Sequence, residues 1–287
     1  MPAILAALTA AFFFSVTNYM SRIGLERATP GAAVLVSAWV NFLTFWTIFF
    51  AIMSPRLLLS PAVFPFLAAG VVGPFFGRLT LYTAMRRMGS SLAVPLHNSQ
   101  AIFAAFGGML FFNERVSSLG WLGIAILLVG LTALSLDSSA GNISGPRRKT
   151  DLLIPLASGL GFAAAFIFRK VGLGIEPQIF LGLPVVATAT LISTYVSMPI
   201  TGERPGFPRG TVLIPLVLTG VFSGTAQLFS LWAVNLGDLS VVIPLQNTSP
   251  VFTMIIVGVF LRRLERVTAL SVLGMLLVMV GGGFLTI

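Results

Sequence analysis

The sequence predicts an all-α membrane protein whose ten transmembrane helices form two inverted five-helix repeats. Three observations predict this class. Of the 287 residues, 56% are hydrophobic and only 9% are charged, whereas soluble domains carry about 25% charged residues. Ten apolar segments reach the ~20 residues that a helix needs to cross a bilayer. In addition, Leu79–Phe103 recurs as Leu228–Phe252, with identical residues at seven of the 25 positions.

Composition also limits what the protein binds and catalyses. The net charge is +9, but the basic residues occur in short groups between apolar runs, which is typical of membrane loops and not of a nucleic-acid-binding face. The chain has no cysteine and one histidine, so we expect no disulfide, no metal site and no cofactor. It has no P-loop and no G-x-S-x-G motif, which argues against ATP-driven transport and against catalytic residues. The expected partners are the lipid bilayer and a small-molecule substrate.

Five predicted spans lie on each side of a polar linker. The start of the chain lacks a basic n-region and a cleavage site, so the first span is interpreted as retained and not as a signal peptide. The first half contains Ala3–Ser21, Gly31–Met53, Ala62–Met85, Ser91–Phe112 and Ser117–Leu136. The second half contains Leu152–Phe168, Gln178–Pro199, Thr211–Asn235, Leu239–Leu261 and Val267–Thr286. The longest polar stretch divides the chain into residues 1–136, a linker at 137–150 and residues 151–287.

The two halves are predicted to be inverted relative to each other. Five is an odd number of spans, so the second half enters the membrane from the opposite side. Matching strings at Glu114-Arg115-Val116-Ser117 and Glu265-Arg266-Val267-Thr268 support the duplication. Twelve Lys and Arg residues fall in the loops on one side of the membrane. Four fall on the other side, and these are Arg56, Arg115, Arg169 and Lys170. The positive-inside rule places the richer side in the cytoplasm and both termini outside.

Two related motifs resemble a known family. The first runs from Arg87 to Leu96 and reads RMGSSLAVPL, and the second runs from Leu236 to Leu245 and reads LGDLSVVIPL. Each is followed by a Phe and then by a Glu at the end of the span. With ten spans and a doubled unit, the chain is similar to the drug/metabolite transporter superfamily, and most similar to its EamA-type members. The resemblance implies two five-helix units and a transport function. It also implies substrates such as amino acids, nucleotide sugars, phosphorylated sugars or drugs, and termini in the cytoplasm, opposite to the charge count.

Arg78 is the most unusual residue inside a predicted span. An Arg at mid-membrane costs at least ~3 kcal/mol unless it faces a cavity or a partner. Its counterpart in the second half is Gln227, so one hypothesis is that Arg78 binds the anionic group of a substrate and Gln227 hydrogen-bonds to it. The alternatives are an Arg that binds carbonyls freed near Pro74, or one that reaches an interface. Tyr82 lies one turn further along the helix, where it contacts substrate or anchors the helix at an interface.

A second group of polar candidates lies in the fourth and ninth spans. His97 titrates near neutral pH, so it either couples proton movement to transport or acts as a neutral hydrogen-bonding group. Its counterpart Gln246 cannot titrate, which weakens a symmetric proton role. Asn98 and Asn247 either bind substrate or hold neighbouring helices together. The full set of candidate substrate-binding residues is Arg78, Tyr82, His97, Asn98, Gln100, Gln227, Gln246, Asn247 and Asn18.

Other residues are predicted to shape the helices. Pro95, Pro244 and Pro250 lack the backbone N–H group that donates a hydrogen bond in a helix, and they act as hinges or as static kinks. Asn18, with Ser15 and Ser21, makes a polar patch that should face the interior, as should the patch formed by Ser37, Asn41 and Thr44. The Gly281-Gly282-Gly283 run and the glycines at 120, 123 and 130 suit close helix packing.

The absence of acidic residues from the middle of the predicted spans narrows the expected function. Export of cationic drugs by proton exchange needs a carboxylate in the membrane. We therefore expect a secondary transporter of a small anionic or zwitterionic metabolite, with an amino acid as the leading candidate, export favoured, and alternating access as the mechanism. The alternatives are a drug exporter, a flippase for a lipid-linked substrate, and a non-transporting scaffold or sensor. The expected protein is monomeric and crosses a bacterial-type inner membrane several times.

Overall fold

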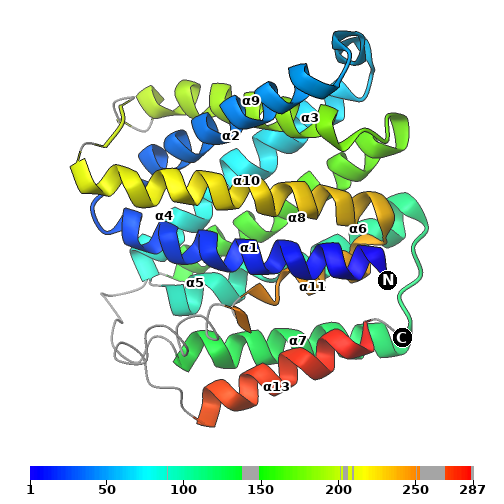
Figure 1. Ribbon diagram of the computed structural model, residues 1–287. Helices are drawn as coiled ribbons and strands as arrows, with labels where there is room; N and C mark the ends of the chain where they lie inside the picture. The colour runs from blue at the N-terminus through cyan, green and yellow to red at the C-terminus, as the bar shows by residue number, and fades with distance from the viewer. Residues whose placement is uncertain are drawn as a thin grey trace.

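The computed structural model describes residues 1–88, 90–137, 149–200, 202, 206–208, 210–249, 251–252 and 269–285. All the regular structure in these ranges is helical (Figure 1). The α-helices are α1 (Pro2–Leu25), α2 (Pro30–Ile52), α3 (Val63–Gly70), α4 (Arg78–Met88), α5 (Ser90–His97), α6 (Gln100–Phe112), α7 (Ser118–Asp137), α8 (Leu153–Ile175), α9 (Ile179–Ile200), α10 (Leu213–Leu236), α11 (Leu239–Gln246) and α13 (Ala269–Phe284). Short helical turns are η1 (Pro55–Leu59), η2 (Val71–Gly77), η3 (Lys149–Leu152) and η4 (Gly210–Val212).

The helices are long and apolar enough for an integral membrane protein. Stretches that could each cross a bilayer are Pro2–Leu25, Pro30–Ile52, Val63–Met88, Thr150–Ile175, Ile179–Pro199 and Gly210–Leu236. Shorter apolar helices are Gln100–Phe112, Ser118–Ala133 and Val272–Phe284. The all-helical membrane class predicted from composition is therefore confirmed. Most of the linker, the end of the ninth predicted span and the predicted hinge Pro250 lie outside the described residues.

The fourth predicted span is not one continuous helix. It is divided into α5 and α6, which are separated by a turn at Asn98 and Ser99. The ninth predicted span begins as α11 and turns at the equivalent pair, Asn247 and Thr248. Each turn comes three residues after a proline, Pro95 or Pro244, which lacks the backbone N–H of a regular helix. The two halves of the sequence thus break their helices at matching positions.

The packing joins elements of the first half to elements of the second. Figure 1 shows α1 lying along α10, α2 beside α9, and α7 beside α13, and these pairs are in contact. In the same way α3 and α4 pack on α8, and α6 packs on α11. A membrane has no water to drive helices together, so such packing depends on close fit and on interhelical hydrogen bonds.

The third predicted span contains a wide helical turn that places Arg78. Between α3 and α4 the chain forms a π-helical turn, η2, which contains Pro74. Pro74 cannot donate to the carbonyl of Gly70, and that oxygen instead accepts a hydrogen bond from Thr190 Oγ1 of α9 at 3.2 Å. Single π-helical turns often occur at functional sites. Here the turn ends at Gly77, so Arg78 is the first residue of α4.

Candidate functional site

Arg78 is buried at the junction of the two halves. Its side chain is only 7% exposed, and Nη1 donates to Ser37 Oγ of α2 at 3.4 Å. A charged guanidinium in such a position is expensive unless it has a partner or a function. Arg78 therefore lies in the interior, as predicted. The partner that the structure describes for it, Ser37, is neutral.

Arg169 is a second buried arginine that the sequence interpretation missed. The sixth span was predicted to end at Phe168, which assigned Arg169 and Lys170 to a loop, but α8 continues to Ile175. Arg169 is 5% exposed, its Nη2 donates to Gln227 Oε1 at 3.2 Å, and its guanidinium lies over the ring of Phe166 at 5.4 Å. Arg78 lies close enough for the two positive charges to repel each other. Gln227, the counterpart of Arg78 in the repeat, therefore accepts a hydrogen bond from Arg169.

The two arginines belong to a polar cluster that four helices contribute to. We call it the arginine cluster, and its members are Ser37 and Asn41 of α2, Arg78 of α4, Arg169 of α8, and Ser223 and Gln227 of α10. Asn41 Nδ2 donates to Ser223 Oγ at 3.3 Å, which links α2 to α10. In the described parts of the chain no carboxylate forms an ion pair with either arginine. The cluster therefore carries two positive charges, and the described residues that bond to its arginines are neutral.

The helix breaks form a second polar group beside the arginine cluster. Asn247 joins the two breaks, because its Oδ1 accepts from Gln100 Nε2 and its Nδ2 donates to the carbonyl oxygen of Asn98 at 3.3 Å. Gln246 Oε1 accepts from Ser230 Oγ at 2.9 Å, and Ser230 lies about one turn along α10 from Gln227. All of the predicted polar residues of the fourth and ninth spans are buried.

Several buried polar atoms in this region have no hydrogen-bond partner in the protein. Within the described residues they are Asn41 Oδ1, Asn98 Nδ2, Gln100 Oε1, Arg169 Nε and Gln246 Nε2. Buried polar atoms in folded proteins are nearly always paired, so each exception asks for an explanation. All five belong to the arginine cluster or to the helix breaks, so these two groups hold donors and acceptors that the described residues leave unsatisfied.

His97 has a defined hydrogen-bond role. Ser158 of α8 donates its only hydroxyl proton to the carbonyl oxygen of Gly77 at 2.6 Å. His97 Nδ1 lies 3.0 Å from Ser158 Oγ, so the imidazole must be the donor in that contact. Its ring also meets Phe162 edge-on at 5.3 Å. This geometry gives His97 a hydrogen-bonding role and connects it, through Ser158, to Gly77, the residue that precedes Arg78.

Two predicted residues lie apart from these groups. Tyr82 is buried, but it packs in an apolar cluster with Val34, Val36 and Leu216. Asn18 is exposed, although Ser15 and Ser21 on either side of it are buried and bonded to carbonyls of their own helix. The expectation that all of this patch faces the interior is wrong for Asn18. Thr44 is exposed as well, whereas Ser37 and Asn41 are buried.

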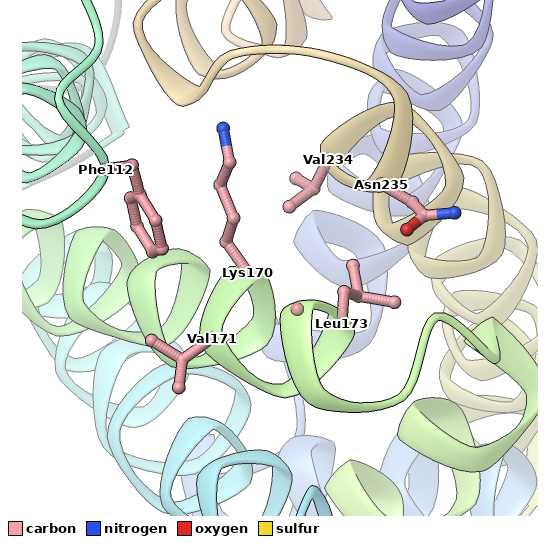
Figure 2. A pocket seen from close by; sticks show the side chains of 7 residues that line it. Phe112, Lys170, Val171, Leu173, Val234 and Asn235 are labelled. Carbon is pink, nitrogen blue, oxygen red and sulfur yellow. The ribbon is translucent and has the colours of Figure 1, made fainter.

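An ionic cluster at one end of the molecule was also missed. Glu114, just after α6, accepts from Lys170 Nζ at 2.6 Å, from Leu239 N at 2.9 Å and from Ser240 N at 3.0 Å. A pocket of about 400 Å³ lies beside it, and Figure 2 shows Lys170 projecting between Phe112 and Val234 in that pocket. The only sequence signal was the matched Glu114 and Glu265, because nothing in the sequence indicated a partner on α8.

The pH dependence of stability should report the Glu114 contacts. Burial raises the pKa of Glu114, but the bonds from Lys170 and from the two backbone N–H groups outweigh burial and hold the pKa below 4.5. A carboxyl with a lowered pKa stabilises the fold above its unfolded pKa and loses that contribution as the pH falls through the folded value. The difference in Tm between the natural chain and Glu114→Gln should therefore be constant from about pH 7 to 5 and shrink below about pH 4.5.

The control for this measurement is Glu26→Gln, since Glu26 is exposed. Its Tm should follow that of the natural chain over the whole pH series. A Glu114→Gln difference that stays constant down to pH 3 would show that the charge of Glu114 does not stabilise the fold.

Buried polar side chains at the interface between two helical halves of a membrane protein are typical of secondary transporters. The model of the EamA-like transporter family matches residues 1–136 and again residues 148–287. The chain therefore belongs to the EamA-like transporter family and is a multi-pass integral membrane protein.

Two further similarities agree with this family. The probable 4-amino-4-deoxy-L-arabinose-phosphoundecaprenol flippase subunit ArnE of Aeromonas hydrophila is 31% identical over 70 residues. That alignment spans 24% of this chain and 61% of the relative. A protein of known crystal structure has a TM-score of 0.82 at 16% identity, over 99% of this chain and 96% of that one. The second similarity shows a shared fold.

Proposed function

We propose that the protein is a secondary transporter of a small anionic or zwitterionic metabolite, with an amino acid as the leading candidate. The observation that carries the proposal is the pair of buried arginines, Arg78 and Arg169, which come from the two halves and have no carboxylate partner among the described residues. Two like charges in a region of low dielectric repel each other strongly. An anionic group bound between them removes that repulsion and satisfies Arg169 Nε, which lacks a protein partner.

The neighbouring amides suit a zwitterion. A carboxylate bound by the two guanidinium groups accepts several N–H bonds in the geometry that arginine favours. Asn41 Oδ1 and Gln100 Oε1 have no protein donor, so they are available to accept from the ammonium group of an amino acid. A cation alone has no buried carboxylate to bind at this cluster, and this argues against export of cationic drugs.

The arrangement of the halves supports alternating access by inverted repeats. If a two-fold axis exchanges the halves, the contact between α1 and α10 must be matched by one between α8 and the third span, and both contacts are present. The interfaces of α2 with α9 and of α7 with α13 each pair an element with its own counterpart, and the contact between α6 and α11 joins the fourth predicted span to its counterpart, the ninth. Rocking of one half against the other would then move Arg78 relative to Arg169.

Several finer expectations remain part of the proposal. Because Arg169 and Lys170 lie within α8, the membrane side with fewer basic loop residues keeps only Arg56 and Arg115 of its four counted residues. The charge difference between the two sides is then larger, which supports our proposal that both termini lie outside. Export, a bacterial-type inner membrane and a monomer are likewise proposed, and Pro95 and Pro244 are proposed hinges at the two helix breaks.

A ligand-stabilisation screen of the purified protein tests the proposal. The probes are amino acids, organic acids, phosphorylated sugars and cationic drugs. A ligand at 100 times its Kd should add ~2.7 kcal/mol to the free energy of unfolding. We expect stabilisation by anions or zwitterions and none by cationic drugs. The proposal fails if only cationic drugs stabilise the protein, and stabilisation by a lipid-linked sugar phosphate alone would favour a flippase.

Ser158→Ala tests the link between His97 and the arginine cluster. The change leaves the carbonyl oxygen of Gly77 and His97 Nδ1 without Ser158 as a partner. Each buried unpaired group costs about 1–3 kcal/mol. We therefore expect a loss of about 1–3 kcal/mol in the free energy of unfolding, together with a weaker response to the stabilising anion, because Arg78 follows Gly77 directly.

Thr132→Ala is the matched control, since the exposed Thr132 bonds only to Leu128 O of its own helix. It should change neither the stability nor the response to ligand. Equal effects of the two variants would contradict a positioning role for Ser158.

A further inference from the structure

At the end of the molecule where α6 and α8 finish, one carboxylate from the first half joins elements of the second half. Asn113 takes a left-handed conformation with φ of 53°, which ends α6 and turns Glu114 back toward the second half. The side chain of Glu114 is 3% exposed. Lys170, which it binds, also donates to Gly237 O at 3.2 Å and lies 3.6 Å from Asp238 Oδ1. We call this set the Glu114 latch.

The latch supplies the N-terminal cap of α11 from outside that helix. Glu114 accepts from Leu239 N and Ser240 N, the first two N–H groups of α11, which no carbonyl of the helix satisfies. Asp238 occupies the ordinary N-cap position with the extended backbone that capping requires, φ −79° and ψ 141°. Its side chain nevertheless makes no capping hydrogen bond and is 61% exposed. The chain thus holds two acceptors for one helix end, and only Glu114 is used.

At the opposite end of α8 the described ion pair is more exposed. There Arg87 Nη1 lies 3.3 Å from Asp151 Oδ1, and the Arg87 side chain is 58% exposed. Exposed ion pairs of this type contribute little to stability. The two ends of the interface therefore differ, with a buried, several-fold hydrogen-bonded contact at one and a solvated contact at the other.

From these contacts we infer that Glu114 is a gate residue: the Glu114 latch keeps this end of the transporter closed, and the end opens when Asp238 replaces Glu114 as the N-cap of α11. The inference rests on the alternating-access proposal for what opening achieves. The exchange of caps explains how the latch releases, because Ser240 N, the second N–H group of α11, keeps an acceptor in both states, whereas Leu239 N, which a side chain at the N-cap does not reach, is left to water. α11 leads directly to the break at Asn247, so this gate is mechanically connected to the polar groups of the site.

Cysteine labelling tests the gate without any substrate. The chain has no cysteine, so Ser240→Cys introduces a single thiol at a position that is 3% exposed. The probe is a membrane-impermeant maleimide. We expect slow labelling of Ser240→Cys and at least about tenfold faster labelling when Glu114→Gln is added, because loss of one partner leaves Lys170 and the helix end uncompensated. Adding Asp238→Ala to Ser240→Cys alone should slow labelling, since the open state loses its cap.

Two controls separate opening from general loosening. Ser21→Cys, 1% exposed on α1, should label at the same slow rate with and without Glu114→Gln. Asp151→Asn, at the other end of α8, should leave labelling at position 240 unchanged. If Glu114→Gln does not fold, Glu114→Asp keeps the charge but shortens the reach, and it should still speed labelling several-fold. Unchanged labelling at 240 in a folded variant overturns the inference, as does equal acceleration at 21 or faster labelling with Asp238→Ala.

Discussion

Arg169→Gln should abolish the response to the stabilising anion while leaving the empty protein as stable as before or more stable. Removing one member of a buried charged contact costs 2–5 kcal/mol in binding, which is a rise in Kd of roughly 30-fold or more. In the empty protein the same change relieves the repulsion between Arg169 and Arg78 and removes the unpaired Nε, which offsets the loss of the hydrogen bond from Arg169 to Gln227 Oε1. A residue selected for function rather than for folding shows this combination of lost binding and retained stability.

The measurement is the Tm of each variant with and without the anion identified in the screen. Arg169→Lys keeps the charge but loses the planar fork, so it should keep part of the response. Arg115→Gln changes the net charge equally at an exposed position and is the control that should bind as the natural chain does. If Arg169→Gln instead lowers the stability of the empty protein and leaves ligand binding unchanged, Arg169 is a structural residue and the proposed anion site is wrong.

The comparison of Arg78 with Arg169 shows where sequence interpretation succeeds and where it stops. Arg78 was identified because apolar residues flank it on both sides, so any predicted third span includes it. Arg169 follows Phe168 and precedes Lys170, and two adjacent basic residues are a natural place to end a span. The stronger signal was the Glu176-Pro177 pair further on, because the residue before a proline is disfavoured in a helix. A predicted sixth span that ended at this pair would have included Arg169.

The sequence repeat predicted which polar residues are buried better than it predicted their hydrogen-bond partners. It correctly directed attention to Asn98, Asn247, Gln227 and Gln246, all of which are buried. Their pairing could not be derived, because sequence equivalence relates residues by symmetry and not by contact. Gln227 is the counterpart of Arg78 but bonds Arg169, and Asn247 bonds the backbone of its counterpart Asn98. The contacts of the Glu114 latch could not be predicted for the same reason, since the partners of Glu114 come from α8 and α11.

For the glycines as well, the sequence predicted close packing but not which residue makes the contact. The sequence predicted close packing for the run Gly281-Gly282-Gly283, but among the residues that the structure describes only Gly281 is in close contact with another helix. A Cβ at Gly281 would lie 2.6 Å from Gly123 O and 2.6 Å from Leu127 N of α7. Counting the described part of the chain alone, the nearest such atom at Gly282 is Leu245 Cδ2 at 3.6 Å, and at Gly283 no such atom lies within 4 Å. A run of identical residues cannot reveal which one faces the neighbour.

Gly281→Ala should therefore destabilise the protein by about 3 kcal/mol, at the upper end of the usual cost of overpacking. The atoms in the way belong to the backbone of α7, so no side-chain rotation can make room and the two helices must separate. Gly282→Ala and Gly283→Ala add the same methyl group to the same helix without that obstruction. They should be neutral, or stabilising by up to about 1 kcal/mol, because alanine favours helix over glycine.

Denaturant or thermal unfolding of the three alanine variants in the same detergent checks this order. Because the substitutions are chemically identical and adjacent, differences between them report position alone. Gly123→Ala provides a reciprocal test, since its Cβ would lie 2.7 Å from Gly281 O. Both close-contact variants should lose similar stability, and the double variant should lose less than the sum, because the first methyl group already separates α7 from α13. Equal stability of Gly281→Ala and Gly282→Ala would mean that α7 and α13 do not pack backbone to backbone in the membrane.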